Sequence, residues 1–351
     1  MMRPSPAGRL LAIAAAAGLA GCETLAYYSQ AVSGHLDLMS RAQPVEKVLA
    51  DARTPQPLRD RLALARSIRD FASRELKLPD NASYRSYADL GRAYAVWNVV
   101  AAPEFSLEPV RSCFPVAGCV AYRGFFARQD AERHAQSLQA QGNDVFVYGV
   151  PAYSTLGRFD DPLLSTFIRY PDAEFARLVF HELAHQVVYL KDDSTFNESF
   201  AVAVEREGVR RWLAAAGREA ELRAWLQGQQ RGEEFVRLLE VARERLARLY
   251  ALRLAPEAMR ARKRGELRAL KENYLALKGA WGGYAGFDRL LEPEPNNALL
   301  ASFATYTQLV PAFERLLAGE GGDLERFYAR VRELAATSAP SSRGPLSTPP
   351  R

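Results

Sequence analysis

Apolar residues recur every three or four positions along most of this chain, which predicts that helices dominate its fold. Residues 23–92 have a mainly helical pattern, and the amphipathic spacing is clearest at 58–76. The same period runs from about 172–335 with short interruptions. Within that stretch a proline separates two amphipathic segments, 235–254 and 257–277, and this arrangement predicts a helical hairpin with a solvated charged face.

The middle of the chain, about 93–170, has a strand-like pattern instead. Runs of β-branched and aromatic residues at 95–100, 120–125 and 144–150 predict three strands. A segment at 127–141 predicts a helix between the last two strands. The expected fold class is therefore α+β and predominantly α-helical, with a small sheet that precedes the larger helical part.

Both ends of the chain differ from this body. Residues 1–21 combine arginines with a short alanine-rich apolar run, the pattern of a secretory signal peptide. Residues 337–351 are rich in serine, proline and threonine, and we expect them to be disordered. Residues 22–336 are expected to form one domain, in which a sheet-containing part (about 93–170) is followed by a helical part (about 171–336).

The segment that follows Pro171 contains the most informative motif of the chain. Its HELAH string places His181 and His185 four residues apart, so the two imidazoles share one helix face, and Glu182 lies beside them. Two such histidines can bind one zinc ion, while the glutamate takes a proton from the metal's water. Only four histidines occur in the 351 residues, so the motif is specific. A core helix with two satisfied histidines is the alternative.

A catalytic zinc ion usually has three protein ligands, so a third must come from elsewhere in the chain. Downstream of the motif, a polar turn with good N-cap residues leads into a second predicted helix at Phe196. Glu198 lies in the first turn of that helix, where a short antiparallel return brings it back toward the histidines. Glu198 is therefore the predicted third ligand, and Glu205, two turns further along the same face, is the reserve.

Cysteine usage and the N-terminus both indicate export. Leu-Ala-Gly directly before Cys22 looks like a bacterial lipobox, which implies that Cys22 carries lipid and is the first mature residue. Glu23 rather than an aspartate implies, by the same resemblance, the outer membrane facing the periplasm. Cys113 and Cys119 then remain as an even pair, which predicts one disulfide in an exported protein. Two reduced thiols or a redox-active pair are the alternatives.

Composition and charge add little beyond a globular class. Hydrophobic residues make up 48% and charged residues 25%, which is enough for a sizeable core. The net charge of +5 comes without a basic motif interleaved with aromatic residues, so we expect no nucleic-acid partner. In an exported lipoprotein the basic balance favours proximity to anionic lipid or cell wall.

HELAHQ followed by FNESFAVAVEREG resembles a bacterial family of predicted lipoprotein aminopeptidases, and more loosely the gluzincin metallopeptidases. The resemblance extends over most of the mature chain and includes the patches 114–124, 152–163 and 296–298 with Tyr306. It implies a zincin-like fold, one zinc ion per chain, a peptide substrate, and zinc peptidase activity. Two departures are the short gap between His185 and Glu198, and Val202 where gluzincins carry an acid.

By the same resemblance, His181, His185 and Glu198 are the zinc ligands and Glu182 is the general base. Gluzincins commonly add a Tyr or His that donates to the oxyanion; Tyr306 is the candidate here, with Tyr153 behind it. Zincins also pair an edge strand with the substrate backbone, and the candidates are 152–157 or 165–169. Asp160, Asp161 and Glu205 are unranked candidates for orienting the histidines, because Val202 cannot do so.

The activity implied by the resemblance leaves alternatives open. Aminopeptidase is the family's label, and such an enzyme needs an acidic anchor for the substrate's free amine. Asp160, Asp161, Glu205 and Glu207 are the candidates. An endopeptidase acting on envelope proteins is one alternative. A non-catalytic zinc-binding lipoprotein with a docking role is another, although the intact Glu182 argues against it.

Overall fold

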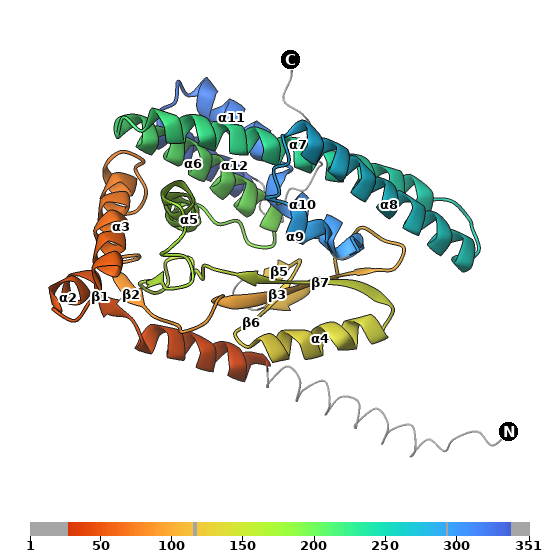
Figure 1. Ribbon diagram of the computed structural model, residues 1–351, viewed down its shortest axis with the longest axis horizontal. Helices are drawn as coiled ribbons and strands as arrows, with labels where there is room; N and C mark the ends of the chain where they lie inside the picture. The colour runs from red at the N-terminus through yellow and green to blue at the C-terminus, as the bar shows by residue number, and fades with distance from the viewer. Residues whose placement is uncertain (1–26, 115–117, 293, 338–351) are drawn as a thin grey trace.

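Helices make up most of the fold and surround a small sheet, as Figure 1 shows for the computed structural model. The structure describes residues 27–114, 118–292 and 294–337, and within them not the side chains at 114, 118 and 304–307. The predicted α+β class with a predominance of helix is confirmed. The two terminal predictions, 1–21 and 337–351, fall on or reach into residues outside the described ranges.

The central sheet has the strand order β6-β3-β7, and all neighbouring strands are antiparallel. It consists of β3 (Val96–Pro103), β6 (Arg123–Phe125) and β7 (Asn143–Val150). Helix α4 (Arg128–Ala140) packs against one face and α10 (Asn297–Thr307) contacts β3 and β7. The strands predicted at 95–100 and 144–150 and the helix predicted at 127–141 are thus confirmed in outline.

Strand β3 is almost wholly apolar, because α4 packs against one of its faces and α10 contacts it as well. Val99 and Ala101 pack against the α4 side, in a core shared with the face of that helix. Asn98, which lies opposite Tyr148 in the register, points the other way and borders a cavity together with Val150. One face of the sheet is therefore core, and the other face is the wall of a cavity.

The run predicted as a single strand at 120–125 is divided into two. β5 (Gly118–Val120) pairs with β4 (Ser112–Phe114) in a hairpin, and β6 begins only at Arg123. Ala121 and Tyr122 lie between the two strands, and Tyr122 reaches the cavity on the open face of the sheet.

Three very short strands form a separate sheet that the sequence pattern did not indicate. β1 (Gln43–Pro44) pairs antiparallel with β2 (Ser86–Ala88), which pairs parallel with β8 (Leu163–Leu164). The expected edge strand at 152–157 or 165–169 is wrong, because neither segment is a strand. Both are turns and extended loop, and the first of them borders the cavity.

The main hydrophobic core lies between the helices that precede and follow the sheet. Residues 27–40, α2 (Val45–Ala50) and α3 (Gln56–Arg74) contribute from the N-terminal part, as predicted for 23–92. The other side consists of four helices: α5 (Asp172–Ala184), α6 (Ser194–Ala215), α11 (Val310–Gly319) and α12 (Leu324–Thr337).

Close packing of α5 on α6 depends on a glycine. A Cβ atom at Gly208 of α6 would lie 2.8 Å from side-chain atoms of Phe180 and Leu76, so only glycine fits there without a shift. The two helices therefore approach closely along their length, which fixes the relative position of the side chains between them.

The predicted helical hairpin is present as α7 (Glu219–Tyr250) and α8 (Pro256–Ala280), with the short α9 (Asp288–Leu291) after it. It packs in a second core, and Figure 1 shows the pair as two long antiparallel helices. The Nζ of the buried Lys263 donates to Asp144 at 2.6 Å, which ties α8 to β7. Within the described residues, no helix combines the length and apolar character of a membrane span.

Cys113 and Cys119 are joined by a disulfide that closes the β4–β5 hairpin. The hairpin lies against the loop between α5 and α6. The backbone N–H of Cys119 donates to Oδ1 of Asp192 at 2.7 Å, and Arg111 donates to the Asp192 carbonyl at 3.0 Å. The bridge therefore stiffens a hairpin that supports this loop.

Replacing both cysteines by serine (Cys113→Ser with Cys119→Ser) should lower the free energy of unfolding by about 2 kcal/mol, because a short closed loop restricts the unfolded chain by roughly that amount. Denaturant unfolding of the variant and of the wild type, with and without reductant, is the measurement. Reductant should shift the wild-type midpoint to that of the variant and leave the variant unchanged. Identical midpoints for all samples would show that the bridge contributes nothing.

Candidate metal centre

The motif histidines lie at the C-terminal end of α5, whose start and end follow from its sequence. Pro171 precedes the first turn, which carries Asp172 and Glu174 where acids favour a helix N-terminus. The helix buries nearly all of its apolar side chains and ends at Ala184, with His185 as its C-cap. His181 and His185 therefore project from the last turn into the interior of the molecule.

Helix α6 returns antiparallel to α5 and presents its glutamates to the two histidines. Its N-cap residue Asp193 accepts a hydrogen bond from the Phe196 N–H at 2.9 Å. Asn197 clamps the preceding loop, because its amide accepts from the Leu190 N–H at 2.7 Å and donates to the Leu190 carbonyl at 2.8 Å. These contacts fix the first turn of α6 and with it Glu198.

His181, His185 and Glu198 form a cluster that could hold a metal ion. The two Nε2 atoms are 3.2 Å apart, and Oε2 of Glu198 lies 3.3 Å from Nε2 of His181 and 3.7 Å from that of His185. One ligand atom from each residue lies within 4.8 Å of the others. The exposed side-chain fractions are only 11%, 7% and 14% in the same order, so water competes little for the site.

Glu205 takes a different place from the one expected of a reserve ligand. Its Oε2 lies 2.8 Å from Nδ1 of His181, on the far side of the ring from the cluster, and 3.1 Å from Arg177. Nδ1 of His181 is therefore the protonated nitrogen, which leaves the lone pair of Nε2 for a cation. Among the three candidates for orienting a histidine, only Glu205 does so; Asp161 accepts from the Thr155 N–H, and Asp160 is exposed.

Buried charges around the cluster favour a cation there. Burial alone lowers the pKa of His181, but its hydrogen bonds to Glu198 and Glu205 outweigh that effect and raise the pKa to about 10. Burial lowers the pKa of His185 to about 4. One positive charge among these groups is thus stabilised, and a metal ion held by the three facing ligand atoms could supply it.

Glu182 points into the same cavity as the cluster. Burial raises its pKa to about 7, with nearby carboxylates adding to the shift and His181 opposing it. The cavity has a volume of about 520 Å³ and is bounded by α5, α6, β3 and β7. A half-buried carboxyl group beside a potential metal site can exchange a proton with a molecule bound in the cavity.

Sequence reasoning missed two tyrosines of the cavity, Tyr122 and Tyr189. Burial and the Glu198 carboxylate both raise the pKa of Tyr122 well above its usual value, so its hydroxyl remains a hydrogen-bond donor. The break in the predicted strand at 120–125 is the feature that brings it there, and the apolar pattern carries no signal for such a break.

Of the remaining predicted site residues, the structure describes the side chain of Tyr153 but not those of Tyr306 and Cys22. Tyr153 lines the cavity, where its ring packs against Phe126 and His35. The backbone of Tyr306 belongs to α10, but its side chain lies outside the described residues, as does all of Cys22.

Replacing Glu205 with glutamine should weaken metal binding by about 10- to 100-fold, the usual effect of removing a group that orients a metal-bound histidine. The variant also leaves Arg177 without one of its two carboxylate partners. Competition titration with a chelator of known affinity measures the change. Glu207→Gln is the matched control, because Glu207 lies on the same helix but pairs with Arg210 and Arg211 at the surface. Equal affinities of the two variants would contradict the role of Glu205.

Fold and site together define a class of protein in which two antiparallel helices hold a buried His–His–Glu cluster beside a sheet-walled cavity. The family model described as "Putative aminopeptidase" matches residues 26–345. The chain therefore belongs to this family, which confirms the aminopeptidase-family part of the resemblance; its lipoprotein part stays a prediction. No curated protein matches the chain. No solved structure matches it either, so the relation to zincins stays a prediction.

Proposed function

We propose that this protein is a zinc-dependent aminopeptidase that hydrolyses peptides in the bacterial envelope. The observation that carries the proposal is the convergence of three lone-pair donors, His181, His185 and Glu198, with a fourth group, the carboxyl of Glu182, at one cavity. Membership of the aminopeptidase family supports the reaction class. Titratable groups with shifted pKa values gather at functional sites, and Glu182, His181 and His185 all have such shifts.

Zinc fits this donor set better than the other common metals. Two imidazole nitrogens and one carboxylate oxygen are typical of catalytic zinc, whereas magnesium and calcium prefer oxygen ligands alone. The hydrogen bond from His181 Nδ1 to Glu205 leaves Nε2 as the donor atom, as ligation requires. Zinc held there would lower the pKa of a water molecule and polarise a peptide carbonyl.

The residues around the site supply the proton transfers. Glu182 accepts the proton of the attacking water and delivers it to the amine that leaves. Tyr122, which borders the same cavity, is assigned the hydrogen bond from its hydroxyl to the oxygen that becomes negative during attack. Tyr306 stays the prediction from family resemblance for the same role. Low exposure of the cluster strengthens each of these electrostatic interactions.

Endopeptidase action is the second candidate function, and the residues that line the cavity support it. The carboxylates among the described residues that line the cavity are Glu182 and Glu198. None of the acids considered as an anchor for a substrate amine (Asp160, Asp161, Glu205, Glu207) is among them. The proposal of exopeptidase action therefore rests on membership of the aminopeptidase family and not on an acidic anchor for the substrate amine.

A peptide panel with metal analysis tests the proposal. The full chain, purified in detergent, should contain about one zinc per chain by mass spectrometry and cleave free peptides, with N-acetylated peptides resistant. Cleavage of blocked and free peptides alike would replace aminopeptidase by endopeptidase. Zinc without any hydrolysis would favour a non-catalytic lipoprotein. A protein that binds no zinc even after it is added would overturn the metallopeptidase proposal.

We also propose that lipid on Cys22 anchors the protein in the outer membrane, facing the periplasm, on the strength of the lipobox-like sequence before it. Cys22→Ala should move the protein from the membrane fraction to the soluble fraction, because the acyl chains supply most of the membrane affinity. Cell fractionation and the intact mass of the wild type check this. Membrane association that persists in the variant, with no lipid mass on the wild type, would contradict it.

A further inference from the structure

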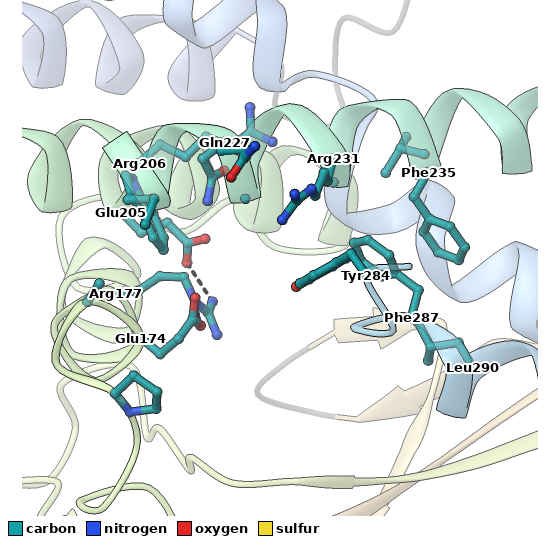
Figure 2. A pocket seen from close by; sticks show the side chains of 18 of the residues that line it. Glu174, Arg177, Glu205, Arg206, Gln227, Arg231, Phe235, Tyr284, Phe287 and Leu290 are labelled. Atoms are coloured by element: carbon teal, nitrogen blue, oxygen red, sulfur yellow. Dashed lines mark hydrogen bonds and ion pairs between the residues drawn. The ribbon is translucent and has the colours of Figure 1, made fainter. Parts of the chain in front are cut away.

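A second cavity, larger than the one at the metal centre, lies between the start of α5 and the long helix α7. Its volume is about 980 Å³. Figure 2 shows Glu174, Arg177 and Glu205 at one end and Tyr284, Phe287 and Leu290 at the other, with α7 along one side. Nothing in the proposed chemistry uses this space.

The two cavities are neighbours, because the same elements border both and Arg177 lines each of them. Helix α5 contributes Glu174 to the larger cavity and His181 to the smaller one, and Arg177 lines both. Strand β7 does the same, with Tyr148 at the larger cavity and Val150, on the same sheet face, at the smaller. Helix α6 likewise borders both cavities. The larger cavity therefore lies next to the smaller one, beyond Arg177.

The distance between the two parts matches a short stretch of peptide. Arg177 and Glu174 precede His181 by four and seven residues on α5, which corresponds to about 6 and 10 Å along the helix axis. An extended peptide advances about 3.3 Å per residue, so two or three residues span this distance. A dipeptide held at the metal centre ends before the larger cavity, and a peptide of four or more residues enters it.

Two glycines of α7 keep the wall of the larger cavity low. Gly228 and Gly232 are one helical turn apart and both line it. A Cβ atom at either position would meet no other atom within 4 Å, so packing within the protein does not require glycine. Each glycine costs the helix about 1 kcal/mol relative to alanine. The space that they leave open is consistent with room for a ligand.

Charge and aromatic side chains indicate the chemistry of that ligand. Of the three arginines shown in Figure 2, Arg177 pairs with two glutamates and Arg206 with two others. Arg231 instead lies over the ring of Tyr284 at 4.6 Å, and among the described residues no carboxylate forms an ion pair with it. Phe287 stacks on Phe235 beside it. A ligand that carries an apolar side chain and a carboxylate would complement the end of the larger cavity formed by Arg231 and these aromatic rings.

We propose that the larger cavity is the distal part of the substrate cleft and holds the portion of a peptide beyond the scissile bond. The preferred substrates are peptides of four or more residues whose distal part carries a large apolar side chain and a carboxylate. This inference rests on the proposed peptidase function, and its test separates the two.

Peptide binding to the zinc-loaded Glu182→Gln variant gives a readout that does not depend on turnover. The probes are an alanine dipeptide and a pentapeptide of alanines with a phenylalanine and an aspartate at its last two positions. We expect the pentapeptide to bind at least about tenfold more tightly by isothermal titration calorimetry, the effect of roughly one buried apolar contact and one ion pair. Amidation of the carboxylates should remove up to about fivefold of this gain.

A second substitution in the same protein blocks the cavity. Gly232→Leu places a side chain in the open space and should reduce the preference for the pentapeptide by about tenfold. Gly265→Leu is the matched control, since Gly265 is also a helical glycine with nothing within 4 Å, but lies on α8 and borders neither cavity. Thermal unfolding should show both variants at least as stable as their parent, because leucine favours a helix more than glycine.

The outcomes separate the two proposals. Equal affinity for both probes overturns the role of the larger cavity, and so does a preference for the pentapeptide that Gly232→Leu leaves intact. In either case, hydrolysis of dipeptides by the wild type still upholds the peptidase proposal. If Gly265→Leu abolishes the preference for the pentapeptide as Gly232→Leu does, the role of the larger cavity is also overturned, because the loss then does not depend on blocking that cavity. Failure to bind either probe, together with no hydrolysis by the wild type, overturns both.

Discussion

Glu182→Gln should lower kcat for peptide hydrolysis by about 10²- to 10⁴-fold, the range expected when a general base is removed. Glutamine has nearly the same shape, but its amide cannot accept the proton of the attacking water. Because Glu182 is not one of the three clustered donors, zinc should remain at about one per chain. Steady-state kinetics and metal analysis of the same sample measure both quantities.

Glu207→Gln is the control for this substitution as well. It removes one carboxylate from α6 at a position where the side chain pairs with Arg210 and Arg211 rather than with the site. Its kcat should stay within about twofold of the wild type, as is usual for a surface ion pair. Comparable activity of Glu182→Gln and the wild type would refute the assignment of the base.

Glu198→Ala should remove most of the bound zinc and with it the activity. The substitution reduces three protein ligands to two, so the loss of metal affinity should exceed the roughly 100-fold upper limit expected for a group that only orients a ligand. Chelator competition and mass spectrometry on the dialysed protein check this. Glu205→Gln is the comparison that matters, because both glutamates contact His181 but on opposite sides of its ring.

The order of the two variants decides which glutamate is the ligand. Glu198→Ala should bind zinc more weakly than Glu205→Gln. The reverse order would assign Glu205 as the third ligand and require its side chain to turn around the His181 ring.

The sequence was sufficient for those parts of the site that depend on local structure. The i, i+4 spacing of His181 and His185 is a property of any helix, and the polar turn before Phe196 marks the start of the next one. A short connection between two helices requires an antiparallel return. These three facts place Glu198 near the histidines without knowledge of the rest of the fold.

What could not be predicted depends on tertiary packing. Glu205 reaches Nδ1 of His181, on the side of the ring that faces away from the His–His–Glu cluster. This contact depends on the close approach of α6 to α5 at Gly208. A glycine within a helical pattern does not by itself predict such an approach. Tyr122 enters the cavity at a break in a strand that looks continuous in sequence. The larger cavity exists only where α7 crosses the start of α5, two segments whose patterns are independent.

The edge strand expected from the zincin resemblance shows the opposite failure. The prediction for segments 152–157 and 165–169 rests on the edge strand of a family fold, and their apolar spacing does not indicate a strand. The first contains Gly157 with a positive φ of 75° and the second forms a tight turn, and neither conformation continues a ladder. The hydrophobic pattern was the better guide here.

All residues of the proposed metal centre lie between 181 and 205, on a single helix–loop–helix unit. Bringing them together closes only one short loop, so little chain entropy opposes assembly of the site. Metal can therefore be captured as soon as α5 pairs with α6, before the N-terminal helices and the sheet have docked. On the proposal that the chain is exported and folds after translocation, zinc would then serve as an early folding template, and refolding should be faster when it is present from the start.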